Sequence, residues 1–138
     1  MKKIIYFLMI LAVTLSMNFI APTPSAAAED APFTVARLVV CKDVVDMEPV
    51  LGNEAKFPLA AGKVYCFLEA RAIKTDCQVN FVWIHAGREL STISLPMKKG
   101  HRWRTYANKK LWGLPGDWRV EIRASTGEVI DSVSFSVE

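Results

Sequence analysis

The sequence predicts an all-β chain, a single immunoglobulin-like β-sandwich of about seven short antiparallel strands. Three observations favour this fold class. Short segments rich in β-branched and aromatic residues recur along residues 35–138. Turn residues separate these segments at regular intervals, which is typical of sandwiches and barrels. The same region contains no convincing 3.6-residue period of an amphipathic helix.

The first 28 residues have the layout of a secretory signal peptide. Two lysines precede an apolar run from Ile4 to Ala21, and the small-residue sequence Ala26-Ala27-Ala28 follows. Cleavage after Ala28 predicts a periplasmic or extracellular protein. Because the run has 18 residues, near the lower limit for a membrane span, an uncleaved signal helix anchored in the inner membrane is the alternative.

Removal of 28 residues from 138 leaves 110, enough for one domain. We expect a short tail at 29–34 and the β-sandwich domain at 35–138. The cut also removes two of the 17 Lys and Arg residues, which leaves 15 against 14 Asp and Glu, a net charge of +1. A near-neutral exported chain disfavours nucleic acid as a partner.

The first half of the domain contains two expected strands and a loop. Residues 35–40 are nearly all apolar and predict a buried strand. Pro49 and Pro58 bracket the next stretch and force the residue before each of them into extended geometry, so we expect a loop with one short strand. Residues 63–70 are rich in aromatic and β-branched residues and predict the second main strand.

The next two strands form an expected hairpin. Residues 78–85 are apolar on both faces, which predicts a central strand, and Trp83 within it resembles the core tryptophan of immunoglobulin domains. Ala86-Gly87 predicts a tight turn into a strand at 88–95, which Pro96 ends.

The last three strands alternate with period two. Residues 102–106 and 117–123 each place alternate residues on opposite faces, with Trp118 on the apolar face of the second. The turn at 125–128 leads into the final strand at 129–137.

Three cysteines in an exported chain predict one disulfide and one remaining thiol. Cys41 and Cys66 both lie in expected strands that could be neighbours, which makes them the favoured pair. Cys77 follows a polar turn and is the expected leftover. Sequence leaves all three pairings and a wholly reduced set open.

The sequence shows no catalytic constellation. We expect His85 at a hairpin rim and His101 in a loop or at the surface, and motifs for serine hydrolases, zinc proteases or phosphate loops do not occur. We therefore predict no catalytic residue, no cofactor and no metal. A hydrolase built on strand carboxylates is a distant alternative, with these candidates: Glu69, Asp117, Glu121 and Asp131.

A basic and aromatic segment is the candidate binding face. No acidic residue occurs between Glu89 and Asp117. Arginine forks and aromatic rings together suit an anionic glycan, an anionic lipid headgroup or an acidic protein surface. The alternative is that the tryptophans pack in the core while the arginines pair across strands. The predicted face comprises Arg102, Trp103, Arg104, Tyr106, Lys109, Lys110 and Trp112.

Several of these strand sequences also carry a family resemblance. The segments that carry the resemblance are Val64-Tyr65-Cys66-Phe67, Val82-Trp83, Arg102-Trp103-Arg104-Thr105, Gly116-Asp117-Trp118-Arg119 and Ser134-Phe135-Ser136-Val137. They resemble the bacterial family called domain of unknown function 2914. The resemblance covers about residues 63–138, and more loosely the chain from Cys41. It departs from the family at Phe81 and at Tyr106-Ala107-Asn108. The resemblance implies a fold and a location and no reaction.

Together these features predict an exported, non-catalytic binding or accessory module of the cell envelope. Its expected partner is an envelope protein or an anionic glycan, held by the basic and aromatic face. A purely structural accessory domain without a ligand is the alternative. Partner identity and oligomeric state are left open by the sequence.

Overall fold

The computed structural model describes residues 31–50 and 55–138. The predicted signal peptide at 1–28 and the first part of the expected tail lie outside these residues. Within the described ranges, no helix is long and apolar enough to cross a membrane.

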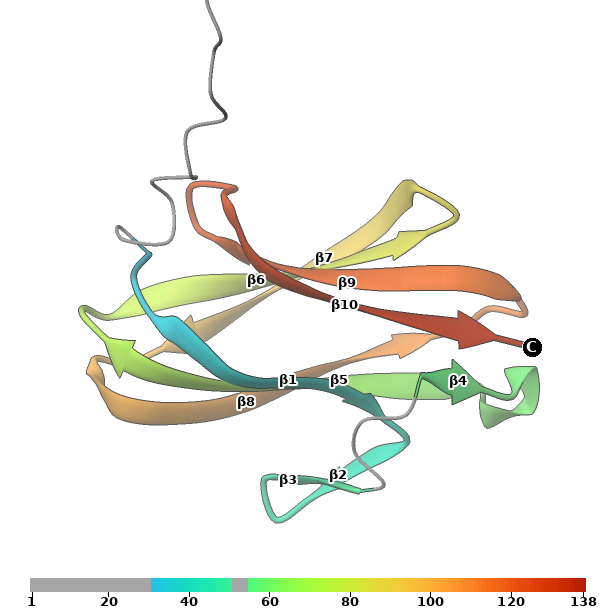
Figure 1. The fold of residues 1–138 in the computed structure, drawn as a ribbon, viewed down its shortest axis with the longest axis horizontal. Coiled ribbons are helices and arrows are strands. Elements are labelled where there is room, and N and C mark those ends of the chain that lie inside the picture. The colour runs from blue at the N-terminus through green and yellow to red at the C-terminus, as the bar shows by residue number, and fades with distance from the viewer. Residues whose placement is uncertain (1–30, 51–54) are drawn as a thin grey trace, which may run out of the picture.

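The described chain folds into two β-sheets that face each other across the core, with one additional hairpin (Figure 1). The short 3-10 helix η1 spans Leu59–Ala61. The strands are β1 (Thr34–Cys41), β2 (Asp43–Val45), β3 (Glu48–Val50), β4 (Lys56–Phe57), β5 (Lys63–Ile73), β6 (Cys77–His85), β7 (Arg88–Met97), β8 (Gly100–Lys110), β9 (Gly116–Ala124) and β10 (Val129–Val137).

The strand order confirms the predicted immunoglobulin-like sandwich. One sheet has the order β1-β5-β8 and the other the order β4-β10-β9-β6-β7. This division corresponds to strands A, B and E against strands C, F and G of immunoglobulin-like domains. The seven long strands are those expected from the sequence, and apart from the two-residue β4 every neighbouring pair within these two sheets is antiparallel.

The core lies between the two sheets and is built by alternate residues of each strand. Trp83 on the central strand β6 is fully buried, as predicted, and Trp118 on β9 is buried beside it. Phe135 on β10 packs edge-on against Trp83 and is stacked with Trp118. Phe33, within the segment expected to be a short tail, is also buried in this core.

The β6–β7 hairpin shows how a turn and a proline are accommodated. Ala86 and Gly87 both have positive φ, the geometry of the two-residue type I′ turn, which glycine adopts without steric cost. Pro96 does not end β7 as predicted but lies inside it, opposite Gln78. A proline is tolerated there because β7 is the edge strand of its sheet.

The hairpin β2–β3 was not predicted from the sequence. It projects from the three-stranded sheet on the side away from the core (Figure 1). Asp46 and Met47 form its turn, and both have positive φ. Asp and Met give a weaker hairpin signal than Asn-Gly or Asp-Gly, which explains why this region was expected to be a loop.

Candidate functional site

Strand β8 divides the predicted binding face between two sides of its sheet. Arg102, Arg104 and Tyr106 point away from the core, opposite Arg71, Glu69 and Phe67 of β5. Trp103 and Lys109 have the opposite parity and lie opposite the core residues Ala70 and Val64, respectively. Because side chains alternate along a strand, tryptophan and flanking arginines cannot share one face.

The outer side of β1-β5-β8 also carries residues that the sequence alone does not assign to the binding face. They come from β1 and β5, where every second residue points outward, and from the hairpin β2–β3. The period-two pattern of residues 63–71 was a usable signal, but strand neighbours had to be known as well. We call this surface, with the loop residue Trp112 beside it, the basic face: Arg37, Glu48, Lys63, Tyr65, Glu69, Arg71, Arg102, Arg104, Tyr106, Lys110 and Trp112.

Glu69 is the centre of an ion-pair cluster on this face. Its carboxylate is only 5% exposed, and Oε1 lies 2.7 Å from Nη2 of Arg102 and 3.5 Å from Nη2 of Arg37. Oε2 lies 3.4 Å from Nη2 of Arg71. Burial raises the pKa of Glu69, but the hydrogen bond from Arg102 and the charges of the three arginines outweigh it, so the net pKa is lowered.

Glu48 of the hairpin is the second carboxylate of the basic face. Arg37 meets it as a fork, with Nη1 3.1 Å from Oε2 and Nη2 3.1 Å from Oε1. Nη1 of Arg104 lies 2.7 Å from Oε1 and also donates to the carbonyl of Met47 at 3.2 Å. The hydrogen bond from Arg37, followed by the charges of both arginines, lowers the pKa of Glu48.

Aromatic rings and lysines continue the face beyond the arginines. The rings of Tyr65 and Tyr106 are 5.9 Å apart, and Nζ of Lys63 lies 5.3 Å from the centre of the Tyr65 ring. Trp112 is 70% exposed, and Nζ of Lys110 lies 5.5 Å from its ring centre. A tryptophan this exposed, beside a cation, is available for a ligand.

The outer face of the five-stranded sheet carries a different arrangement. Glu121 accepts hydrogen bonds from Arg119 and Arg123, and Glu89 pairs with Arg123 at 2.7 Å. The hydrogen bonds that Arg123 donates to Glu89 and Glu121 raise the pKa of its guanidinium. We call these four residues the balanced ladder, because two arginines face two carboxylates.

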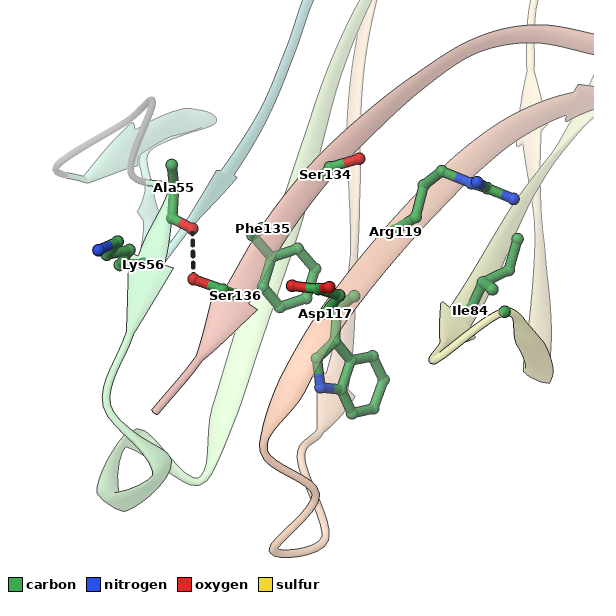
Figure 2. Close-up of a pocket in the computed structure, with 10 residues that line it drawn as sticks. Ala55, Lys56, Ile84, Asp117, Arg119, Ser134, Phe135 and Ser136 are labelled. Carbon is green, nitrogen blue, oxygen red and sulfur yellow. Dashed lines mark hydrogen bonds between the residues drawn. The ribbon is translucent and has the colours of Figure 1, made fainter.

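A shallow groove of about 430 Å³ lies beside the balanced ladder. Figure 2 shows Ser134 and Arg119 beside it, and the hydroxyl of Ser136 donating to the carbonyl of Ala55 at 3.5 Å. Its two aromatic lining residues are buried, so the groove lacks the exposed rings of the basic face. The lining residues are Ala55, Lys56, Ile84, Gly87, Asp117, Trp118, Arg119, Ser134, Phe135 and Ser136.

The histidines take the positions expected of them. His85 ends β6, and its Nε2 lies 2.8 Å from the carbonyl oxygen of Pro115. Its ring packs on Trp118 with the ring centres 4.8 Å apart. His101 is an exposed residue of β8. Among the residues that the structure describes, no group of three His, Cys, Asp or Glu side chains could hold a metal ion.

The strand carboxylates proposed for a hydrolase do not converge. Glu69 lies on β5, in the three-stranded sheet. Asp117, Glu121 and Asp131 belong to β9 and β10 of the other sheet. Glu69 and Glu121 therefore lie on opposite outer faces of the sandwich.

The predicted disulfide between Cys41 and Cys66 is not present. The two residues lie in neighbouring strands, but Cys41 is opposite Tyr65 and Cys66 is opposite Val40. This one-residue offset places their side chains on opposite faces of the sheet. Burial, followed by the proximity of Cys41, raises the pKa of the Cys66 thiol. Cys77, the expected leftover, is half-buried at the start of β6.

Solved structures similar to this chain are parts of much larger enzymes. A β-glucosidase from Listeria innocua in complex with glucose has a TM-score of 0.47 and 11% identity, over 76% of this chain and 15% of that one. A β-glucosidase from Kluyveromyces marxianus in complex with glucose has a TM-score of 0.46 and 9% identity, over 77% of this chain and 14% of that one. Likeness at this level carries no argument about function.

No match to a curated protein was found. Residues 76–137 match the family described as "Protein of unknown function (DUF2914)". The match begins after β5, so Arg37, Glu69 and Arg71 of the basic face lie outside it. The predicted resemblance is confirmed for residues 76–137, where the chain is similar to the DUF2914 family.

Proposed function

We propose that this protein is an exported, non-catalytic binding module of the cell envelope that holds an anionic glycan on its basic face. The observation that carries the proposal is the charge imbalance of the ion-paired part of this face. Four arginines share two carboxylates there, those of Glu48 and Glu69. Lys63 and Lys110 add positive charge beside the rings of Tyr65 and Trp112. The signal-peptide pattern of residues 1–28 supports export.

The shape of the face favours an extended, linear ligand. Outward-pointing residues of one strand follow one another every 6.6 Å or so, because the rise is about 3.3 Å per residue. Arg102, Arg104, Tyr106 and Lys110 therefore form one row along β8 that is about 26 Å long. A polysaccharide chain can lie along such a row with its acidic groups on the arginines and its ring faces on the aromatic side chains.

A glycan suits this face better than an acidic protein does. Charged residues are depleted in the centre of protein–protein interfaces, whereas here arginines and glutamates occupy the centre of the face. Tyr106 on β8 and Trp112 in the following loop are exposed rings of this face, at 37% and 70% exposure. Separate rings beside cations are suited to individual sugar units.

One observation favours the alternative that the protein is a structural accessory domain without a ligand. Arg102 and Arg104 already have carboxylate partners within the chain, at 2.7 Å in each case. If these ion pairs only stabilise the sandwich, the face has no ligand. This alternative predicts that no anionic polymer binds.

Fluorescence anisotropy with labelled polygalacturonate, a uronate polymer, tests the proposal. We expect the wild-type protein to bind at low ionic strength and to release the polymer as salt is added. Tyr106→Ala should weaken binding, whereas Arg119→Ala, on the balanced ladder, should not. Failure of the wild-type protein to bind this polymer overturns the proposal, as does equal binding by wild type and Tyr106→Ala. Binding of an acidic protein in place of the polymer would also contradict it.

A further inference from the structure

The two carboxylates of the basic face differ in burial and in the element that carries them. Glu69 is on the central strand β5 and its side chain is 5% exposed. Glu48 comes from the hairpin β2–β3, and its side chain is 50% exposed. Exposed ion pairs contribute little to stability because solvent screens them. Glu48 is therefore the carboxylate that a ligand can replace.

The hairpin that carries Glu48 leaves much of its apolar surface in solvent. Val45, Met47 and Val50 all remain exposed. This end of the hairpin is held against the face by the contacts of Glu48 with Arg37 and Arg104. The hydrogen bond that Arg104 donates to the Met47 carbonyl adds to these contacts. Their loss would release the tip of the hairpin from the face.

The contacts of Glu48 also indicate which chemical group fits between the two arginines. The Arg37 fork contacts both carboxylate oxygens at 3.1 Å, and Arg104 adds a third short contact at 2.7 Å. Fork-to-carboxylate pairing of this kind recognises the planar shape of the group as well as its charge. The space that Glu48 occupies is thus shaped for a carboxylate.

We propose that Arg37 and Arg104 form the carboxylate subsite of the basic face, and that Glu48 occupies it until a uronate of the glycan displaces it. The inference rests on the proposed function and narrows its ligand to a uronate-bearing polysaccharide. Displacement exchanges one carboxylate for another, so the arginines stay paired throughout. The hairpin moves off the face when the polymer binds.

Glu89 provides a matched control on the other face of the molecule. Its Oε1 lies 2.7 Å from Nη2 of Arg123, the same distance as between Glu48 and Arg104, and its side chain is 56% exposed. Glu89→Gln thus removes one similarly exposed carboxylate charge from an arginine pair outside the basic face.

The test measures the affinity of wild type, Glu48→Gln and Glu89→Gln for labelled polygalacturonate. We expect Glu48→Gln to bind about three- to ten-fold more tightly, because an internal competitor is weakened, and Glu89→Gln to bind like wild type. The gain should vanish when Arg104→Gln is added to Glu48→Gln. It should also be absent with fully methyl-esterified polymer, which lacks free carboxylates.

Hydrogen exchange of residues 43–50 in the wild-type protein provides a second measurement. We expect faster exchange in the hairpin when the polymer is added. Unchanged or weaker binding by Glu48→Gln overturns the inference while leaving the proposed function intact, and so does slower exchange, since it would make the hairpin a clamp. Absence of polymer binding to wild type and to Glu48→Gln overturns the inference and the proposed function together.

Discussion

The basic face and the balanced ladder lie on opposite outer surfaces of the sandwich and use the same residue types. On each surface a nearly buried glutamate sits mid-strand among arginines, Glu69 on β5 and Glu121 on β9. Glu121 has two arginine partners, and one of these is also paired with Glu89. Glu69 has three arginine partners, and one of these is shared with Glu48. The two surfaces thus differ in charge balance.

This difference arises from which strands are neighbours. The arginines around Glu121 come from its own strand, at two residues before and two residues after it. Glu69 receives one arginine from its own strand and one from each neighbouring strand, β1 and β8. A sheet therefore concentrates positive charge when three adjacent strands each place an arginine on the same side, which no single strand can do.

The largest expected effect is the loss of stability in Glu69→Gln. Three arginines then lose a shared counter-charge at a buried position, and we expect a cost of about 2–3 kcal/mol, below the full value for a buried pair because Arg71 and Arg102 are half exposed. Glu121→Gln should cost about 1 kcal/mol, since Arg123 keeps Glu89. Urea unfolding of both variants measures the difference. Equal losses would mean that the two clusters are equivalent.

Reversing the charge of one arginine should lower affinity for the polymer on the basic face and leave it nearly unchanged on the balanced ladder. We expect Arg104→Glu to lower affinity for polygalacturonate by about ten-fold or more, because it removes a cation and adds repulsion at the proposed carboxylate subsite. Arg119→Glu makes the same change on the balanced ladder and should alter affinity by less than about two-fold. Similar losses in both variants would show that overall charge, and not the basic face, determines binding.

Acid should destabilise the basic face through Glu69. Its folded-state pKa is lowered from the ordinary value of 4.5, so its stabilising contribution is full above that value and is lost as the pH falls through the folded-state pKa. We expect the thermal midpoint of the wild-type protein to fall more steeply below pH 4.5 than that of Glu69→Gln. Parallel pH profiles of the two proteins would contradict this assignment.

The smallest effect on stability is expected at Trp112. Trp112→Ala should change the free energy of unfolding by less than about 0.5 kcal/mol, because the side chain is mostly in solvent, while lowering polymer affinity. Trp103→Ala is the contrasting variant, since Trp103 packs against the core and its truncation should cost about 2–3 kcal/mol. The reverse order of the two stability losses would refute the division of β8 into two sides.

Much of the fold was predictable because its signals are local. The period-two alternation of residues 117–123, the apolar run around Trp83 and the turn at Ala86-Gly87 each indicate an element without knowledge of the rest. The hairpin β2–β3 was missed because its turn uses Asp46 and Met47, which carry a weak turn signal. The sequence predicts that Pro96 ends a strand, because it does not show that β7 lies at the edge of its sheet.

The candidate site was predictable only in part. The segment around β8 supplied Arg102, Arg104 and Tyr106, but the same alternation that predicts the strand also places Trp103 on the other side. The predicted disulfide failed for a related reason, since neighbouring strands bring Cys41 and Cys66 close while a one-residue offset turns their side chains apart.

The sequence by itself determined the seven long strands, the buried tryptophans of the core and the local excess of cations before Asp117. The tertiary structure alone decided which of those cations share a surface and which carboxylates they meet. Residues 37, 48, 69 and 104 are far apart in the chain and come together through strand pairing and the position of one hairpin. Register and strand order depend on long-range contacts across the whole sandwich, and local sequence patterns do not encode them.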